Sequence, residues 1–290
     1  MGLIGAAIGL GFVVGPALGG LLAPLGPAFP FWVGMLVALV NALLVLRFLP
    51  ETRWMGTACP PVSSTTHDRG VALAGWRQVL RHPLVARLVV VNFLFTIAFT
   101  AMETVFVLFT QHTFGWTARQ NGYLFTYIGL LIVLMQGVAV GQLARRWGER
   151  RLLLAGLVLL AAGLALLPWS TNLASLVVVL GIVSIGDGAV TPMLSTLLSF
   201  ASAPEARGET LGLTQGVASL ARVIGPLAAG TAFAIGGPGA PFLVGSALVV
   251  LAALIAFSAR LSTHERNPAH TVSAVQTASS EETTAMAREH

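Results

Sequence analysis

Long apolar runs, separated by short polar segments, follow one another from the first residues of the chain to about residue 260. Each run has about the 20 residues that an α-helix needs to cross the roughly 30 Å hydrocarbon layer of a membrane. We expect eight spanning helices, over residues 3–22, 28–49, 84–111, 121–143, 151–168, 173–200, 209–235 and 239–260. The pattern predicts an all-α fold, a polytopic membrane helical bundle.

Two longer polar segments divide the chain. Residues 51–83 are rich in Pro, Ser and Thr, which is typical of a flexible linker. Residues 263–290 are polar and show no hydrophobic periodicity, which predicts a disordered tail. We therefore expect a two-helix unit over 1–50, the linker, and a six-helix unit over 84–262 before the tail.

Composition and charge support this interpretation. The chain is 56% hydrophobic and only 9% charged, with a mean hydropathy of +0.84, whereas soluble domains carry about 25% charged residues. A net charge of +5 would suggest a nucleic-acid partner in a soluble protein. Here every basic residue is arginine and most lie between the apolar runs, so we expect a lipid bilayer as partner and no nucleic acid.

The arginines also predict the orientation. Six lie between residues 47 and 87, four in the segment RRWGERR and three after the last run. The loops at the other ends of the helices hold only Arg119. The positive-inside rule then places the linker, the RRWGERR segment and the C-terminus in the cytoplasm of a multi-pass protein of the cell membrane.

A ten-residue phrase occurs twice, as GFVVGPALGG at 11–20 and ARVIGPLAAG at 221–230. Pro16 and Pro226 are 210 residues apart, and the next apolar runs open with PFWVG and PFLVG at an offset of 211. We infer two homologous units in the same orientation, although an eight-helix protein with an unequal repeat is an alternative. Within the second unit four spans precede its copy, and within the first unit none does, so we interpret the chain as the last eight helices of twelve.

Small residues spaced by four form a groove along a helix in both copies, and such grooves let two helix backbones approach closely in a membrane. Tight packing is the simpler interpretation. The functional one is that helices bent at Pro16 and Pro226 seal or rock against each other where the two halves meet. The grooves consist of Gly11, Gly15 and Gly19, and of Ala221, Gly225 and Ala229.

These residues resemble a motif of the major facilitator superfamily. The fifth-helix antiporter motif of that family is matched by Gly2, Gly11, Gly15, Pro16, Gly19 and Gly20, and in the second copy by Gly212, Ala221, Gly225, Pro226, Ala229 and Gly230. The segment LPETR at 49–53 is similar to the family's exit from its sixth helix.

The segment GQLARRWGERR at 141–151 resembles the family's loop between helices eight and nine. Arg145 occupies the position of an acidic residue in the stronger form of this motif, so the charge role of that acid does not carry over. The matching positions are Gly141, Arg145, Arg146, Gly148, Arg150 and Arg151.

The resemblance is closest to drug:proton antiporters, including tetracycline-type efflux pumps. It implies a twelve-helix fold of two halves, of which this chain holds helices 5 to 12, and proton-driven efflux of small, drug-like amphipathic molecules. The implied partners are the substrate and protons, with no cofactor and a monomeric protein. Two alternatives remain: a truncated chain that cannot transport, and an exporter of a metabolite such as a sugar or an amino acid.

Three ionisable residues fall well within the predicted spans, away from their ends: Glu103, Asp187 and Arg222. A charge near the centre of a membrane helix costs about 2.5–3.5 kcal/mol on insertion scales, so each needs a partner or a wet cavity. One interpretation is a structural ion pair between Asp187 and Arg222. The other is that Glu103 or Asp187 takes up a proton or meets a cationic drug. Glycines on both sides of Asp187 and a nearby proline predict a local helix distortion there.

Polar side chains inside the spans are weaker candidates for a substrate cavity. An Asn or Gln in a helical bundle more often forms an interhelical hydrogen bond, worth about 0.6 kcal/mol. These candidates are Asn92, Gln136 and Gln215, with Thr191 and Ser195 beside them.

Enzyme chemistry finds no support in the sequence. It contains no metal-ligand cluster, no phosphate-binding loop and no nucleophile elbow. It also contains no soluble nucleotide-binding domain, which an ATP-driven pump requires. We expect a transporter and not an enzyme.

Overall fold

The computed structural model describes residues 11, 15, 18, 19, 22, 25, 26, 28–48, 82–203 and 206–258. Most of the first expected span, the linker and the tail lie outside these residues, so the predicted division of the chain stays a prediction. Helix α2 (Phe29–Phe48) is 20 residues long, and none of its side chains is buried.

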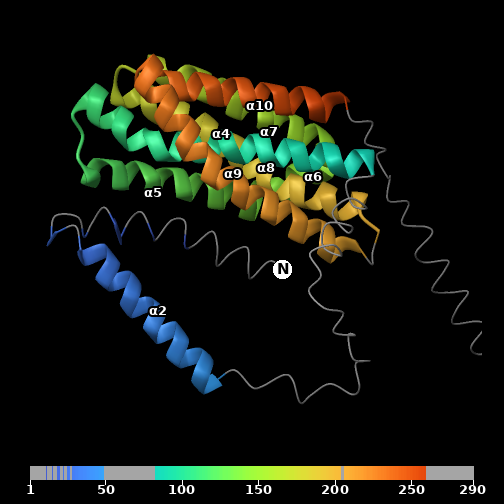
Figure 1. The fold of residues 1–290 in the computed structure, drawn as a ribbon, viewed down its shortest axis with the longest axis horizontal. Helices are drawn as coiled ribbons and strands as arrows, with labels where there is room; N and C mark the ends of the chain where they lie inside the picture. Colours follow the sequence, from blue (N-terminus) through green and yellow to red (C-terminus); the bar gives the residue numbers. More distant parts are fainter. Residues whose placement is uncertain are drawn as a thin grey trace, which may run out of the picture. The chain divides into compact units, whose positions relative to one another are not determined.

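Six spanning segments follow α2 and form one packed body (Figure 1). They are α4 (Pro83–Phe114), α5 (Ala118–Leu134) continued by η3 (Met135–Ala139) and α6 (Val140–Trp147), α7 (Glu149–Leu166) continued by η4 (Leu167–Trp169), α8 (Leu173–Ala201), α9 (Arg207–Gly236) and α10 (Ala240–Ser258). With α2, seven helices of the described residues are long and apolar enough to span a membrane. The predicted spans from 28 to 260 are confirmed as helices, with ends shifted by a few residues.

Helix ends follow from local sequence. Helix α4 begins with Pro83, whose missing N–H costs nothing at that position. It ends at Gly115, which adopts a left-handed conformation with φ 67°. Asn172 caps α8 by accepting a hydrogen bond from the Ser175 backbone N–H at 2.8 Å. Between α6 and α7, Gly148 has φ 80°, which favours glycine and lets the chain reverse direction within one residue.

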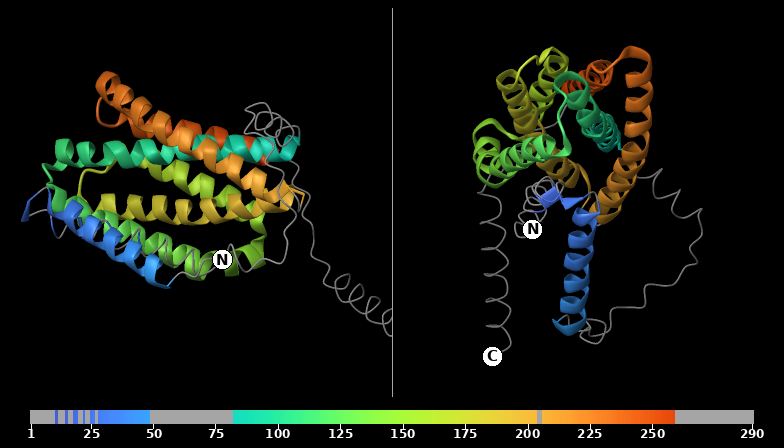
Figure 2. Two further views of the ribbon diagram at one scale, coloured as in Figure 1. Left: turned by 60° about the horizontal axis from the view of Figure 1, so that its bottom comes forward. Right: turned by 90° about the vertical axis from the view of Figure 1, so that its left-hand side faces the viewer.

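The helices of the body differ in how extensively they contact one another. Helix α8 packs most extensively on α7, α9 packs on α4, and α10 packs on both α4 and α7, while α5 packs on α8 (Figure 2). Helices α4 and α5 touch at few points, as do α8 and α9. The most extensive contacts are those of α7 with α8 and of α4 with α9, and the cavity described below lies where packing is sparse, between α4 and α5.

The prediction of a helix distortion beside Asp187 in α8 is wrong. Helix α8 runs without a break from Leu173 to Ala201, through Pro192. The irregular backbone is the π-helical segment η3 on the neighbouring span. A Cβ on Gly188 would lie 2.8 Å from the Cβ of Met135 in η3. The glycine beside Asp187 therefore serves close packing against the π-helical turn, while its own helix stays regular.

Candidate functional site

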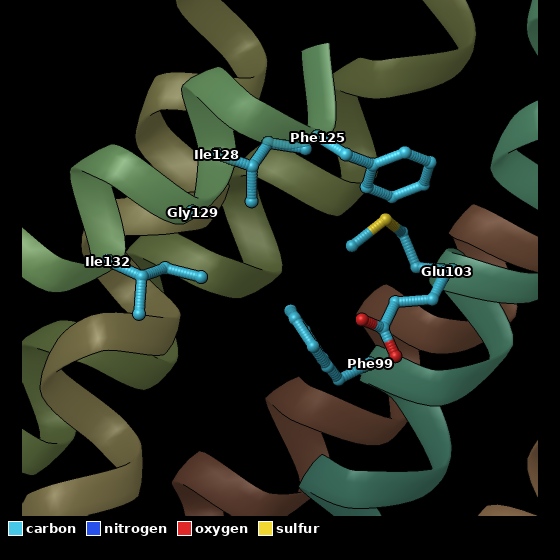
Figure 3. Close-up of a pocket in the computed structure, with 7 residues that line it drawn as sticks. Phe99, Glu103, Phe125, Ile128, Gly129 and Ile132 are labelled. Atoms are coloured by element: carbon cyan, nitrogen blue, oxygen red, sulfur yellow. The ribbon is translucent and has the colours of Figure 1, made fainter. Parts of the chain in front are cut away.

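A cavity of about 60 Å³ lies between α4 and α5 (Figure 3). A cavity needs about 10–15 Å³ to hold one water molecule. This cavity therefore has room for a few waters or a small chemical group. Its lining consists of Phe99, Met102 and Glu103 from α4 and Phe125, Ile128, Gly129 and Ile132 from α5.

Glu103 is the single charged residue of this lining. It lies one helical turn after Phe99, and its carboxylate points into the space between the two helices (Figure 3). The opposite wall includes Phe125, whose ring packs edge-to-face on the fully buried Phe106 at 5.5 Å between centroids. The cavity is therefore an apolar chamber with one carboxylate at its wall.

Asp187 is the buried acid of the body, with 6% of its surface exposed. The neighbouring Gly186 lets α8 approach α7 closely at this point, because a Cβ on Gly186 would lie 2.7 Å from the backbone nitrogen of Leu160 in α7. No residue in the described ranges forms a hydrogen bond with the Asp187 side chain. Asp187 is not part of the cavity lining, but its helix α8 contacts α4, which carries Glu103.

Arg222 lies on the exposed surface of α9, and its positive charge acts on Glu103. The ion pair considered between Asp187 and Arg222 is wrong. No salt bridge joins the two side chains in the described part of the chain, since Arg222 is exposed whereas Asp187 is buried. Helix α9, the next helix after α8 in sequence, packs mainly on α4.

The weaker polar candidates do not gather at the cavity. Asn92 and Gln136 are half-buried and Gln215 is exposed. Within the described residues, none of these three side chains forms a hydrogen bond, so the interhelical bonds considered for them are absent there. Thr191 and Ser195 are exposed, and the Ser195 hydroxyl donates to the Thr191 carbonyl of its own helix at 3.2 Å.

One buried polar pair was missed by sequence reasoning. The Thr110 hydroxyl donates to Asn121 Oδ1 at 2.7 Å, and the Asn121 amide donates to the Thr117 carbonyl at 3.1 Å. Both side chains are almost completely buried and tie the end of α4 to the start of α5. The apolar cavity walls were missed as well, because Phe125, Gly129 and their neighbours look like ordinary membrane-helix residues.

The second antiporter-motif copy is confirmed as a packing surface. Ala221, Gly225 and Ala229 are all buried in α9. A Cβ on Gly225 would lie 3.1 Å from the Ile97 carbonyl oxygen in α4. By contrast, Cβ atoms on Gly212 and Gly230 would meet nothing within 4 Å.

The first copy is described only in part. Gly2, Pro16 and Gly20 lie outside the described residues. Gly11, Gly15 and Gly19 are described, and a Cβ on any of them would meet no other described residue within 4 Å. The predicted packing of the first copy, and the relation between the two copies, stay predictions.

The RRWGERR segment forms the junction of α6 and α7. Arg145 Nε donates to the Gly141 carbonyl of its own helix at 3.2 Å. Arg150 Nη2 donates to the Phe257 carbonyl at the end of α10 at 2.7 Å. Arg146 and Arg151 are exposed.

Comparison with known proteins identifies the family. The model of the Major Facilitator Superfamily matches residues 1–145 and 104–286. The chain belongs to the major facilitator superfamily. Its members are transporters and not enzymes, and this chain is a multi-pass membrane protein.

Several relatives in the superfamily are similar to the chain. It is 30% identical to human major facilitator superfamily domain-containing protein 10 over 266 residues, which cover 87% of this chain and 57% of the relative. It is 28% identical to the class B tetracycline resistance protein of Escherichia coli, with 78% and 55% covered. It is also 28% identical to multidrug resistance protein 2 of Bacillus subtilis strain 168, with 80% and 57% covered. The chain thus spans just over half the length of these relatives.

A solved structure confirms the fold. The crystal structure of the human organic anion transporter MFSD10 (TETRAN) superposes with a TM-score of 0.70 at 29% identity. The superposition covers 88% of this chain and 62% of that one. The predicted major facilitator fold is therefore confirmed.

Proposed function

We propose that the chain belongs to a proton-coupled efflux antiporter for small amphipathic molecules, and that Glu103 and Asp187 exchange the proton. The observation that carries the proposal is the position of Glu103, a lone carboxylate in an apolar cavity, with the buried Asp187 on the contacting helix α8 as a second acid. The tetracycline and multidrug resistance proteins among the relatives support an efflux role.

The physical argument rests on the cost of two negative charges in a medium of low dielectric. Like charges repel strongly there, and a shared proton removes the repulsion. Arg222 supplies a positive charge near Glu103, so the number of protons on the two acids depends on what else binds beside Glu103. A substrate that enters the cavity changes that balance, which couples substrate binding to proton release.

The aromatic walls fit an amphipathic substrate. Phe99 and Phe125 offer apolar ring surface on opposite sides of the cavity, and ligand sites typically combine such surface with a few placed polar groups. The cavity as described is smaller than a drug. Binding of a larger molecule therefore requires α4 and α5 to separate, which their few mutual contacts allow.

The test uses the chain reconstituted in liposomes with an imposed pH gradient and tetracycline as the probe. Substrate-induced proton movement is followed with a trapped pH dye in the wild type, Glu103→Gln, Asp187→Asn and the double variant. We expect each single variant to lose proton movement, and the double variant to lose little more, because the two acids act as a unit. Glu209→Gln is the control, since Glu209 is exposed in the first turn of α9.

Unchanged proton movement in both single variants and the double variant would contradict the role of the acids. A wild-type chain that folds but moves neither tetracycline nor protons, while a sugar or amino acid is transported, would favour the metabolite exporter. A folded chain that transports none of these would favour the transport-incompetent alternative.

One observation favours a second substrate class. Arg222 is exposed on α9, and the human relative with a solved structure is described as an organic anion transporter. An anionic substrate would then bind Arg222 while a proton neutralises Glu103. The same assay separates this candidate from the first when tetracycline is replaced by an aromatic carboxylate and Arg222→Gln is the variant. Loss of carboxylate transport in Arg222→Gln, with tetracycline transport retained, supports the anionic substrate.

We also propose the cell membrane as the location, with a cytoplasmic C-terminus and a monomeric protein. The arginine distribution supports the orientation. Cysteine labelling from either side of intact cells tests it, with a single cysteine placed at exposed Trp147 or at Arg119 of the Cys59→Ser variant. Labelling of position 147 from outside would contradict it.

A further inference from the structure

Three helix ends meet at the face of the body that carries the RRWGERR segment: the starts of α4 and α7 and the end of α10 (Figure 1). Two arginines hold them together. Arg87 Nη1 donates to the Ser258 carbonyl at 3.3 Å, and Arg150 Nη2 donates to the Phe257 carbonyl at 2.7 Å. The last carbonyls of a helix have no partner within the helix, so Arg87 and Arg150 cap α10 from two neighbouring helices.

The positive charge of this cluster is not neutralised by these bonds, because the acceptors are uncharged carbonyls. Arg151 follows Arg150 in the first turn of α7, where Glu149 is the single acid. That turn is the positive end of the helix dipole, which disfavours cations and favours an anion. The cluster of Arg87, Arg150 and Arg151 thus carries more positive charge than the adjacent acid offsets.

A free donor points to a ligand. Arg150 Nε is buried and has no hydrogen-bond partner in the part of the chain that the structure describes. A buried N–H of a charged group without a partner is costly, so we expect an acceptor atom to lie beside it. A water molecule or a ligand atom completes the hydrogen bonds of this guanidinium, and the surrounding positive charge favours an anion nearby.

The surroundings of the cluster are suited to lipid. Trp147, next to the junction of α6 and α7, is 53% exposed, as expected of a side chain anchored at the membrane interface. Large apolar side chains continue along the exposed surfaces of α7 and α10, and they include Val158, Leu251, Leu254 and Phe257. The basic cluster therefore lies at headgroup level, above a surface that contacts acyl chains.

We propose that the ends of α4, α7 and α10 form a binding site for the phosphate group of an anionic phospholipid. The exposed side chains of Arg87 and Arg151 donate to phosphate oxygens, Arg150 adds positive charge, and the acyl chains run along the exposed apolar surface of α10. Basic clusters at the ends of membrane helices attract anionic headgroups in this way. The site is separate from the Glu103 cavity, so it does not depend on the proposed function.

The test is native mass spectrometry of the full 290-residue chain in a nonionic detergent. Phosphatidylglycerol and phosphatidylcholine of identical acyl chains are added in a titration. We expect the wild type to prefer phosphatidylglycerol, and Arg87→Gln and Arg150→Gln each to reduce the preference about fivefold, in line with the attraction of one basic residue to an anionic surface. Arg119→Gln is the matched control, because Arg119 lies at the start of α5 and donates to Tyr123 of the same helix.

Arg150→Gln also weakens the cap of α10, so a second variant and a second measurement guard against misfolding. Arg151→Gln removes a charge from an exposed side chain that has no part in the cap, and we expect it to reduce the preference as well. In the wild type, raising the salt concentration should reduce the preference because the interaction is electrostatic.

Three results would overturn the proposal. The first is equal binding of the two lipids by the wild type, or a preference that does not respond to salt. The second is that all three single variants, Arg87→Gln, Arg150→Gln and Arg151→Gln, keep the wild-type preference for phosphatidylglycerol. The third is equal protection against thermal unfolding by glycerol phosphate and by phosphatidylglycerol at the same concentration, which would assign the site to a soluble phosphate.

Discussion

The backbone of Gly225 in α9 contacts that of Ile97 in α4, since a Cβ at position 225 would lie 3.1 Å from the Ile97 carbonyl oxygen. The same Cβ would lie 3.2 Å from the Thr100 Cβ and 3.3 Å from the Ala101 nitrogen. Two of these three neighbours are backbone atoms, which cannot rotate away as the end of a side chain can. The glycine of the repeated phrase is therefore required by helix packing in this half of the protein, whatever further role it has in transport.

Gly225→Ala should force α4 and α9 apart. Overpacking of a close contact typically costs about 1–3 kcal/mol, so we expect a lower midpoint in thermal unfolding of the detergent-solubilised chain. Gly212→Ala is the matched control on the same helix, because its Cβ meets nothing within 4 Å. Alanine is favoured over glycine in a helix by about 1 kcal/mol, so the control should be neutral or stabilising. Equal effects of the two substitutions would contradict the packing argument.

A second substitution tests whether a clash with a side chain can be relieved. A Cβ on Gly163 in α7 would lie 2.6 Å from Cγ2 of Val183 in α8. Gly163→Ala should destabilise the chain, and adding Val183→Ala should restore part of the loss, since neighbouring substitutions are not additive. The readout is the unfolding midpoint of each single variant and of the pair.

Gly186→Ala tests a clash that truncating a side chain should not relieve, in contrast to Gly163→Ala. Its Cβ would lie 2.7 Å and 2.8 Å from the Leu160 nitrogen and the Gly156 carbonyl oxygen. These are backbone atoms, so no truncation of a neighbouring side chain should rescue this variant. Recovery of Gly186→Ala by Leu160→Ala would show that α7 and α8 separate more easily than the structure implies.

Thr110→Val should loosen the turn between α4 and α5. The substitution removes the hydroxyl that donates to Asn121 Oδ1 and leaves that buried oxygen without its donor. Hydrogen bonds between membrane helices are worth about 0.6 kcal/mol on average, and at most about 1.7 kcal/mol. We expect a loss in this range in denaturant unfolding. Thr104→Val is the control, because its exposed hydroxyl bonds the Thr100 carbonyl of its own helix at 2.8 Å, and a comparable loss there would point to helix propensity instead.

Gly129→Val should fill the cavity beside Glu103. Gly129 lines the cavity from α5, so the added methyl groups enter the space that the carboxylate faces. We expect proton-coupled transport to fall about tenfold or more, equivalent to about 1.4 kcal/mol of lost transition-state stabilisation. The unfolding midpoint should hold or rise. Gly137→Val is the control, since a Cβ there meets nothing within 4 Å, and a similar loss of transport in both variants would contradict the role of the cavity.

Residues with a local signature were predicted well. Twenty-residue apolar runs defined α2 and the six later spans, because only a helix satisfies its backbone hydrogen bonds within a lipid bilayer. The spacing of Ala221, Gly225 and Ala229 predicted their shared buried face, since residues four apart lie on one side of a helix. Glu103 and Asp187 were identified because a charge in an apolar run is conspicuous.

Residues whose role depends on another helix were not predicted. The π-helical turn lies in the span of Met135 and not beside Asp187, and Met135 packs there against Gly188 of another helix. The partner of Arg222 was assigned to the helix next to it in sequence, whereas α9 packs on α4.

The sequence alone therefore determined the helices, the membrane environment, the family and the two acids, because each of these depends on composition and local period. The tertiary structure alone decided that Glu103 lines a cavity walled by Phe99 and Phe125, and that Arg87 and Arg150 meet at the end of α10. The physical reason is that a membrane helix presents apolar side chains on all sides. Its sequence consequently carries little information about which neighbour each side contacts, and close packing among several helices makes that choice.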